Sequence, residues 1–216
     1  MADLDQTIRL YLDEKIAIAK TFDVAEISRL VGAVINCYDH DGSVYIFANG
    51  GPAGCAEGFA TDLKTHPFVA EDKNQTMDMR RLRVHCLNES AGVITGISND
   101  LGYEMIFAEQ MKNFMRSAEY NQHDLVIGLS GSGNSPNVLN AFAFAKSFGA
   151  TTACITGRDG GKAKSAADIC VMIPGTSSFP GQTGGNDNNF HIEDFQTSVA
   201  HIVTGLLKKH VWKGIR

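Results

Sequence analysis

Apolar positions at the start of the chain recur every three or four residues. Leu4, Ile8 and Ile16 follow this spacing, and the segment ISRLVGAVINCY carries a second apolar stripe. Such spacing places apolar side chains on one face of a helix. The pattern therefore predicts a helical hairpin over residues 1–40, ahead of a core formed by residues 41–216.

Beyond residue 41 the pattern changes to short, continuous apolar runs that alternate with helical stretches. The runs are residues 44–48, RLRVHCL, LVIGLS, TTACIT and ICVMIP, and the helical stretches include SPNVLNAFAFAKSFG and a final amphipathic segment over residues 191–209. Continuous apolar strands separated by helices indicate strands that are buried on both faces. The sequence thus predicts an α/β fold with a parallel, doubly wound sheet.

One segment fits neither pattern. Residues 174–190, PGTSSFPGQTGGNDNNF, are polar and rich in glycine. We expect this segment not to pack against the core, and either a lid over a site or a disordered stretch would account for it.

The overall composition argues against several partners and locations. Of 216 residues, 44% are hydrophobic and 20% are charged, and the formal net charge of -5 favours neither nucleic acid nor an anionic membrane as a partner. The start, MADLDQTIRLYLDEK, lacks the features of a signal peptide, and no segment has membrane-spanning length. A cytoplasmic protein is therefore expected. Five cysteines without CxxC spacing predict free thiols.

A cluster of hydroxyl and glycine residues follows the LVIGLS run. In LSGSGNSPN, Ser130, Ser132 and Ser135 offer hydroxyls, and Gly131 and Gly133 let backbone N–H groups turn toward one point. The cluster precedes a helix, whose N-terminus favours an anion. Neither a GxxxxGK[ST] loop nor a GxGxxG motif is present, so a single phosphate, as in a sugar phosphate, fits better than a nucleotide. The alternative is an ordinary serine-rich loop that caps the next helix.

A second glycine-rich loop follows the first apolar run. Gly50 and Gly51 end the strand over residues 44–48, and Pro52 suits the first position of a helix. Ligands of parallel sheets bind at the carboxyl ends of the strands. Both glycine-rich loops fall there, so we expect them to face one site.

Four segments of the chain together resemble the SIS (sugar isomerase) domain family, in the same order. They are ANGGPAGCAEGFATDL, GISNDLGYEMIFAEQM, GLSGSGNSPNVLNAFAFAKSFGATTACITGRDGG and IEDFQTSVAHIVTGLL. Within that family the chain resembles the phosphoheptose isomerase branch. The resemblance implies a single domain over residues 1–216, a three-layer αβα sandwich of the flavodoxin-like type with a five-stranded parallel sheet. It also implies a sugar phosphate substrate and a homotetramer with active sites at subunit interfaces.

The resemblance assigns a set of substrate-binding residues. The family's phosphate loop falls on Ser130, Ser132, Asn134 and Ser135, and its first glycine-rich loop falls on Asn49, Gly50 and Gly51. Asn99 and Asp100 match a pair that lies near the sugar, although a turn that caps a helix would account for them equally well. The serine that normally follows the two glycines is Pro52 here, which removes one hydroxyl and one N–H donor.

The catalytic positions of the branch are mostly changed in this chain. Histidine, glutamate, glutamine and histidine, which bind zinc in some members, are replaced by Gly58, Asp62, Glu193 and His201. Aldose–ketose isomerisation needs a base that moves a proton between adjacent carbons through an enediol. We expect Glu193 and His201, eight residues apart on one helix, to act as a pair. Asp62 would assist, because its shorter side chain withdraws the carboxylate by about 1 Å.

A purely structural role would also account for each of these three residues. Glu193 would favour the dipole of the last helix, His201 would be a half-buried structural histidine, and Asp62 would be a surface residue. The sequence does not establish that the reaction requires a cofactor. Zinc is nevertheless chemically compatible with Asp62, Glu193 and His201, with His191 as a further nitrogen ligand.

The function that these observations favour is an aldose–ketose isomerase acting on sedoheptulose 7-phosphate or a related sugar phosphate. Gly58 opens space at the sugar end and therefore allows a different sugar. The alternative is a non-catalytic phosphosugar-binding or protein-interaction module, similar to the replication-initiator-associating protein of the same branch. Lyase or epimerase chemistry would start with the same proton abstraction.

Overall fold

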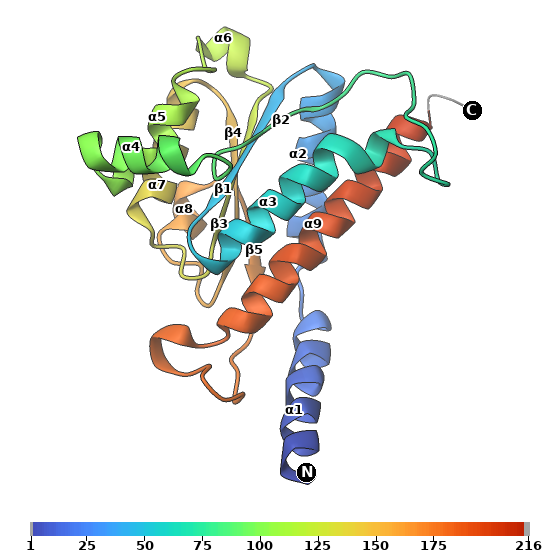
Figure 1. Ribbon diagram of the computed structural model, residues 1–216, viewed down its shortest axis with the longest axis vertical. Coiled ribbons are helices and arrows are strands. Elements are labelled where there is room, and N and C mark those ends of the chain that lie inside the picture. The colour runs from blue at the N-terminus through green and yellow to red at the C-terminus, as the bar shows by residue number, and fades with distance from the viewer. Residues whose placement is uncertain (1, 214–216) are drawn as a thin grey trace.

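The computed structural model describes residues 2–213 and contains a parallel five-stranded sheet flanked by helices (Figure 1). The strands are β1 (Ser43–Ala48), β2 (Arg83–Cys86), β3 (Leu125–Ser130), β4 (Thr151–Gly157) and β5 (Ile169–Ile173). Their order across the sheet is β2-β1-β3-β4-β5, which is the flavodoxin-like order. The predicted α/β sandwich and its five strands are confirmed.

Helices follow most of the strands. The longer ones are α1 (Ala2–Ala19), α2 (Val24–Asp39), α3 (Gly51–Thr65), α4 (Ala91–Leu101), α7 (Pro136–Ser147) and α9 (Asn189–Trp212). The short ones are α5 (Ile106–Met111), α6 (Ala118–Asn121), α8 (Ala163–Ala166) and the 3-10 turns η1 (His66–Phe68), η2 (Tyr103–Met105) and η3 (Gly184–Asn186). Among the helices of residues 2–213, none combines the length and the apolar character needed to cross a membrane.

Alternate residues of the strands enter two separate apolar cores. Val44 and Ile46 of β1 pack with α2, α3 and α9, whereas Tyr45 and Phe47 pack with α5 and α7. Successive side chains of a strand point to opposite faces of the sheet, so both faces of β1 are covered. This double burial explains why the strands appear in the sequence as continuous apolar runs.

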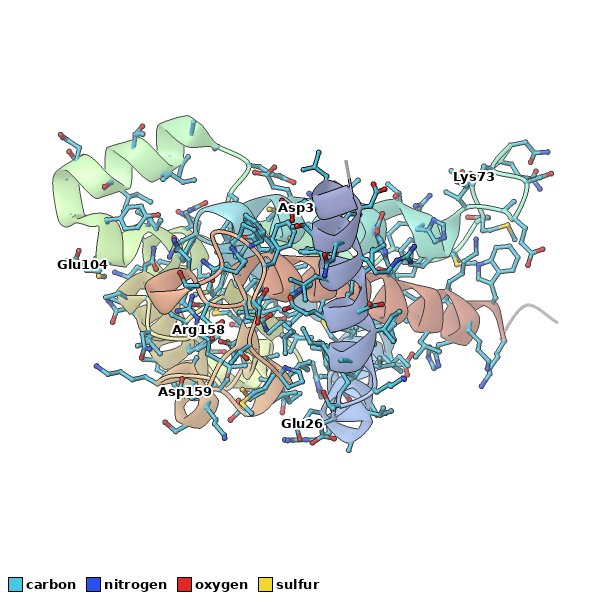
Figure 2. The ribbon with its side chains drawn as sticks, turned by 90° about the horizontal axis from the view of Figure 1, so that it is seen from below. Asp3, Glu26, Lys73, Glu104, Arg158 and Asp159 are labelled. Carbon is cyan, nitrogen blue, oxygen red and sulfur yellow. The ribbon has the colours of Figure 1, made fainter. Side chains whose placement is uncertain are left out.

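The first helix does not fold back on the second. α1 projects away from the sheet layers and does not lie alongside α2 (Figure 1), so the predicted helical hairpin is wrong. Seen from below, α1 stands in front of the rest of the chain, with Asp3 near its start (Figure 2). The reason is that polar side chains of α1, including Tyr11 and Lys15, bind the start of α9.

The glycine-rich segment over residues 174–190 adds no side chain to either apolar core, as expected, but three of its polar side chains are buried. Ser177, Gln182 and Asn188 are 9%, 1% and 0% exposed. Asn188 donates hydrogen bonds to two backbone carbonyls at the start of the segment, both at 3.1 Å, and Gln182 accepts one from the N–H of Phe190 at 2.7 Å. Buried amide side chains hold this segment, and they leave no apolar periodicity in the sequence.

Candidate active site

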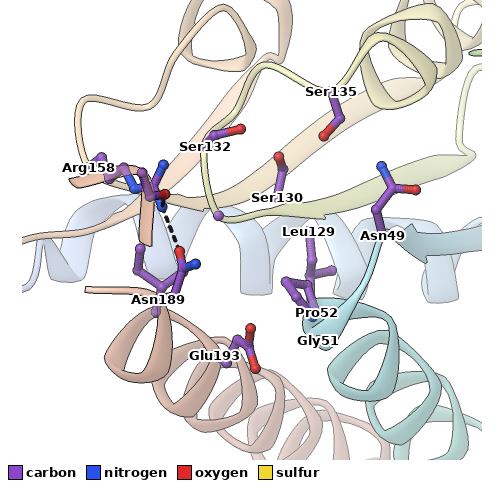
Figure 3. Close-up of a pocket in the computed structure, with 13 residues that line it drawn as sticks. Asn49, Gly51, Pro52, Leu129, Ser130, Ser132, Ser135, Arg158, Asn189 and Glu193 are labelled. Atoms are coloured by element: carbon purple, nitrogen blue, oxygen red, sulfur yellow. Dashed lines mark hydrogen bonds between the residues drawn. The ribbon is translucent and has the colours of Figure 1, made fainter. Parts of the chain in front are cut away.

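The carboxyl ends of β1, β3 and β4 meet around a cavity of about 300 Å³ (Figure 3), a volume at the lower end of small-ligand sites. The first turns of α3 and α9 border it. Six residues that were predicted from the sequence to form the site line this cavity: Asn49, Gly51, Ser130, Ser132, Ser135 and Glu193. The prediction that the two glycine-rich loops face one site is confirmed.

The serine loop, residues 130–135, turns three hydroxyls toward the cavity (Figure 3). Ser130 Oγ accepts a hydrogen bond from the N–H of Gly133 at 3.0 Å, and Ser132 Oγ accepts one from the N–H of Asn134 at 3.3 Å. Because both oxygens are acceptors in these bonds, their protons can be donated to a ligand. Ser135 is the N-cap residue of α7, yet its side chain makes no capping bond. Capping of α7 therefore does not account for this hydroxyl.

Asn134 shapes the serine loop but does not line the cavity. Its side chain donates to Ser132 O at 3.0 Å and accepts from the N–H of Lys162 at 3.1 Å. The two loops approach so closely that a Cβ on Gly133 would fall 2.0 Å from Gly160 O. Gly133 also has a φ of 65°, which favours glycine. Asn134 therefore joins two loops, and its predicted contact with the phosphate stays a prediction.

Asn49 reaches the cavity with its amide group already bonded. Asn49 and Asn137 exchange two reciprocal hydrogen bonds of 2.8 and 2.9 Å, and the hydroxyl of Tyr103 donates to Asn49 Oδ1 at 2.8 Å. Asn137 is 1% exposed, so the pair is firmly held. Gly50 is the N-cap residue of α3 with a φ of 64° and makes the turn from β1 into the helix. Gly51, the next residue, forms part of the cavity lining.

Arg158 adds a positive charge to the cavity and was not predicted from the sequence. Its guanidinium donates to Gly185 O and Asn189 Oδ1, both at 2.6 Å, and to Asp187 O at 3.2 Å. These bonds bring residues 185–189 to the edge of the cavity. A signal was present in the sequence, because Arg158 comes two residues after the predicted strand TTACIT, whose carboxyl end lies at the edge of the sheet that carries the serine loop.

Glu193 enters the cavity from α9 and lies against the first turn of α3. A Cβ built on Gly51 would fall 2.3 Å from Glu193 Oε1. Burial raises the pKa of Glu193 above its ordinary value, and the negative charge of Asp194 raises it further. A carboxyl group with a raised pKa is suited to accept a proton and to return it.

Asp62 and His201 line a neighbouring cavity between α3 and α9. His201 Nε2 lies 3.6 Å from Asp62 Oδ2, and the His201 side chain is 65% exposed, so it is not a half-buried structural histidine. Gly51 borders both cavities. Eight residues of helix separate Glu193 from His201 by about 12 Å along the axis. The structure therefore places His201 beside Asp62, and the expected joint action of Glu193 and His201 on one substrate stays a prediction.

A family model described as "SIS domain" matches residues 11–157 of this chain. The chain belongs to the SIS family. It is 31% identical over 202 residues to the phosphoheptose isomerase of Helicobacter pylori (strain P12), with 93% of both chains covered. It is also 32% identical over 154 residues to the probable phosphoheptose isomerase of Thermoplasma volcanium, covering 71% of this chain and 72% of that protein. Within the SIS family it belongs to the phosphoheptose isomerase branch.

Two solved structures share the fold of this SIS protein. The phosphoheptose isomerase of Neisseria gonorrhoeae superimposes with a TM-score of 0.72 at 22% identity and 96% coverage of each chain. The enzyme of Francisella tularensis gives a TM-score of 0.74 at 21% identity, with coverage of 97% of this chain and 100% of that one. The fold that the sequence resemblance implied is thereby confirmed.

The donor set of this SIS protein does not fit the zinc ion that some members of the branch bind. Gly58 offers no ligand atom, and Glu193 borders a different cavity from Asp62 and His201. His191, the predicted further nitrogen ligand, is buried and lies 3.0 Å from a carboxylate of α1. Within residues 2–213, no three His, Cys, Asp or Glu side chains converge as metal ligands. The predicted zinc set is therefore not formed by these residues.

Asn99 and Asp100 lie at the end of α4, outside the lining of the cavity. Both are exposed, and Asn99 donates a hydrogen bond to Asp100 at 2.8 Å. Tyr103 follows them and bonds Asn49 of the cavity. The predicted role of the Asn-Asp pair near the sugar stays a prediction.

Proposed function

We propose that this SIS protein converts an aldose phosphate to a ketose phosphate, with sedoheptulose 7-phosphate or a related sugar as substrate. As a member of the phosphoheptose isomerase branch, it is a phosphosugar isomerase. One observation supports the assignment of the reaction to this cavity: three serine hydroxyls, a guanidinium and a carboxyl group with a raised pKa converge there.

The phosphate of the substrate binds to the serine loop in this proposal. Ser130, Ser132 and Ser135 donate hydrogen bonds to it, and the N-terminus of α7 favours its negative charge. Arg158 adds a cation at the edge of the cavity, where it also holds Asn189. An anchored phosphate fixes the position of the sugar carbons relative to Glu193.

Glu193 acts as the base. It removes the proton from the carbon next to the carbonyl group while the carbonyl oxygen gains a proton, which gives an enediol. It then returns the proton to the former carbonyl carbon as the neighbouring hydroxyl group loses its own. Because burial and Asp194 raise its pKa, the protonated form that must exist between the two steps is stabilised. Glu193 thereby replaces the acid–base residues that the resemblance assigns to the positions of Gly58 and Asp62.

The Asp62–His201 pair handles charge on the sugar oxygens. Gly51 borders both cavities, so a sugar that extends from the serine loop past Gly51 reaches the second cavity with its far end. There His201 exchanges a proton with a sugar oxygen while Asp62, 3.6 Å away, orients the imidazole. Gly58 lines this second cavity and leaves this end of the site wider than the histidine of the branch pattern would.

Proton NMR in deuterated water tests the proposal. Pentose, hexose and heptose phosphates are incubated with the protein, and deuterium wash-in is followed at the carbon next to the carbonyl group. We expect wash-in with at least one sugar, loss of wash-in in Glu193→Gln, and a strong reduction in His201→Ala. Line broadening by phosphosugars without wash-in for any sugar would contradict the isomerase and support the binding module.

The chain acts as a homotetramer with sites at subunit interfaces in this proposal. Leu4, Ile8, Leu12 and Ile16 form a stripe on α1 and are 43–65% exposed, and Ile202 and Leu206 of α9 are 44% and 42% exposed. Apolar surfaces of this kind are typical of an interface. Light scattering should give the mass of four chains, and Ile8→Glu should lower that mass. A monomer at all concentrations would contradict this assembly.

A further inference from the structure

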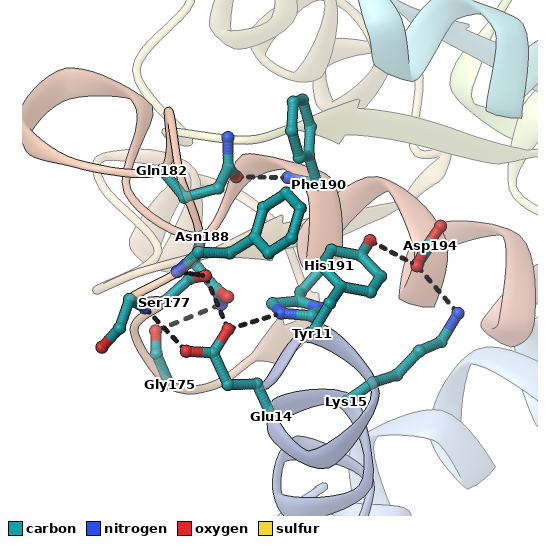
Figure 4. A network of polar contacts seen from close by, with 12 residues as sticks. Tyr11, Glu14, Lys15, Gly175, Ser177, Gln182, Asn188, Phe190, His191 and Asp194 are labelled. Carbon is teal, nitrogen blue, oxygen red and sulfur yellow. Dashed lines mark hydrogen bonds and ion pairs between the residues drawn. The ribbon is translucent and has the colours of Figure 1, made fainter. Parts of the chain in front are cut away.

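The start of α9 is held by a helix from the other end of the chain (Figure 4). One turn of α1, formed by Tyr11, Glu14 and Lys15, contacts residues 177–194. Three residues at the start of α9 line the cavity, namely Asn189, Ile192 and Glu193. The contacts of α1 therefore fall directly beside the site, although α1 itself does not line it.

Glu14 receives three polar contacts on its two carboxylate oxygens. Ser177 Oγ and the N–H of Ser178 each donate at 2.7 Å, and His191 Nε2 lies at 3.0 Å. The Glu14 side chain is 15% exposed and that of His191 is 0% exposed. Burial acts to raise the pKa of Glu14, but the bonds from Ser177, Ser178 and His191 outweigh it and lower the pKa. The ionised carboxylate is thus the form that fits this environment.

A chain of hydrogen bonds leads from Glu14 to the cavity. Ser177 donates to Glu14 through its hydroxyl and to Asp187 Oδ1 through its backbone N–H, the latter at 3.1 Å. Asp187 O accepts from Arg158 Nε at 3.2 Å, and Arg158 in turn holds Asn189 at 2.6 Å. Arg158 and Asn189 both line the cavity. A displacement of Ser177 would therefore also displace Arg158, the cation that faces the ligand.

The same turn of α1 also fixes the residue next to the base. The Tyr11 hydroxyl and Lys15 Nζ donate to Asp194 Oδ2 at 2.7 and 2.8 Å. The ring of Tyr11 stacks on that of His191 with a centroid distance of 4.2 Å. The first two turns of α9 are thus held from one side by α1, while Arg158 holds their start from the other.

We propose that Glu14 is a positioning residue for the substrate cavity. It holds Ser177, Ser178 and His191 so that Arg158 and Asn189 meet the phosphate, and it does not touch the substrate itself. This inference rests on the proposed function, because it takes the ligand of the cavity to be a phosphosugar.

Glu14→Ala in the full chain tests the inference, with Asp13→Ala as the matched control. Asp13 is the adjacent carboxylate on α1 and is exposed. We expect Glu14→Ala to raise KM roughly 10-fold or more with a smaller change in kcat, and to speed backbone hydrogen exchange in residues 177–190. Asp13→Ala should match the unaltered protein in both measurements. Glu14→Gln should fall between the two, because its amide has one acceptor oxygen for three partners.

A double-mutant cycle separates positioning from general loss of stability. If Glu14 acts through Ser177, then Ser177→Ala raises KM less in the Glu14→Ala background than in the unaltered protein. An equal effect of Ser177→Ala in both backgrounds would overturn the proposed route.

The remaining outcomes are also decisive. An unchanged KM and unchanged exchange in Glu14→Ala would overturn the inference. If the unaltered protein turns over no sugar phosphate, the proposed function fails. The role of Glu14 is then decided by the rates of backbone hydrogen exchange and by the affinity for inorganic phosphate, measured by calorimetry. If Glu14→Ala does not fold, the comparison of Glu14→Gln with Asp13→Asn gives the answer.

Discussion

The carboxylate of Glu193 lies directly against the backbone of Gly51, where α9 and α3 meet beside the serine loop. A Cβ on Gly51 would fall 2.3 to 2.5 Å from the carboxylate atoms of Glu193. The proposed base therefore owes its position to the absence of a side chain on the opposite helix. Gly51 borders both cavities, so this contact lies between the proposed phosphate-binding end and the cavity of Asp62 and His201.

Gly51→Ala should displace the Glu193 carboxylate. The added methyl group meets only the end of a flexible side chain, so the fold should tolerate it, while kcat/KM should fall about 10- to 100-fold. Steady-state kinetics and thermal unfolding check this. The control is Gly32→Ala on α2, where a Cβ would meet no atom within 4 Å, and full activity in Gly51→Ala would contradict the role given to the contact.

Arg158→Lys should weaken binding of the phosphosugar. An ammonium group keeps the charge but cannot donate to Gly185, Asp187 and Asn189 in the planar geometry of the guanidinium. We expect KM to rise roughly 10-fold with a modest change in kcat. Lys162→Ala removes an exposed cation from the same loop and should leave KM unchanged. Equal KM values for the unaltered protein, Arg158→Lys and Lys162→Ala would contradict a role of Arg158 in binding.

Asp194→Asn should move the acid limb of the pH profile of kcat/KM to lower pH. The charge of Asp194 raises the pKa of Glu193, second to the effect of burial, so removing the charge lowers that pKa and the base stays ionised in more acidic solution. The titration of the substrate phosphate is common to both proteins and cancels in the comparison. Tyr11→Phe removes a bond to Asp194 but not its charge, and should shift the limb less. A shift to higher pH would contradict this electrostatic coupling.

Asp168→Asn should destabilise the fold at neutral pH but not in acid. Asp168 accepts two bonds from Thr152 at 2.7 and 2.9 Å and pairs with Lys146 at 2.8 Å. Burial acts to raise its pKa, but Lys146 and Thr152 lower it below 3.8. Because the folded pKa lies below the unfolded one, the stabilisation is present above pH 3.8 and is lost as the pH falls through the lowered value.

Urea unfolding measures this effect. At neutral pH Asp168→Asn should lower the free energy of unfolding by about 1 kcal/mol, a value reduced for partial exposure. The difference from the unaltered protein should shrink in acid, whereas Asp13→Asn should show no difference at either pH. A difference that does not depend on pH would mean that the charge of Asp168 is not the cause.

The strands and the serine loop could be predicted because their signals are local. All six residues of β3 are buried, which makes the strand a continuous apolar run, and the serine loop follows it directly. The packing of residues 174–190 could not be predicted in this way. Its partner Glu14 lies 163 residues away from Ser177, and single polar contacts over such a separation leave no periodic pattern.

The predicted Glu193–His201 pair shows a different limit of sequence reasoning. A helical wheel places Glu193 and His201 within about 80° of each other around the axis, but it ignores the roughly 12 Å of rise between them. Arg158 was missed because the serine loop alone accounts for a phosphate site. The bond from Arg158 to Asn189 depends on the path of the chain after β5, which the sequence does not reveal.

The contact between α1 and the start of α9 also orders events during synthesis. α1 is translated before α9, and Glu14 can bind Ser177 and His191 only after these two residues have left the ribosome. A nascent chain that ends before α9 already contains the serine loop, but one side of its cavity is still missing. The proposed phosphosugar cavity is therefore complete only when α9 has emerged and met α1.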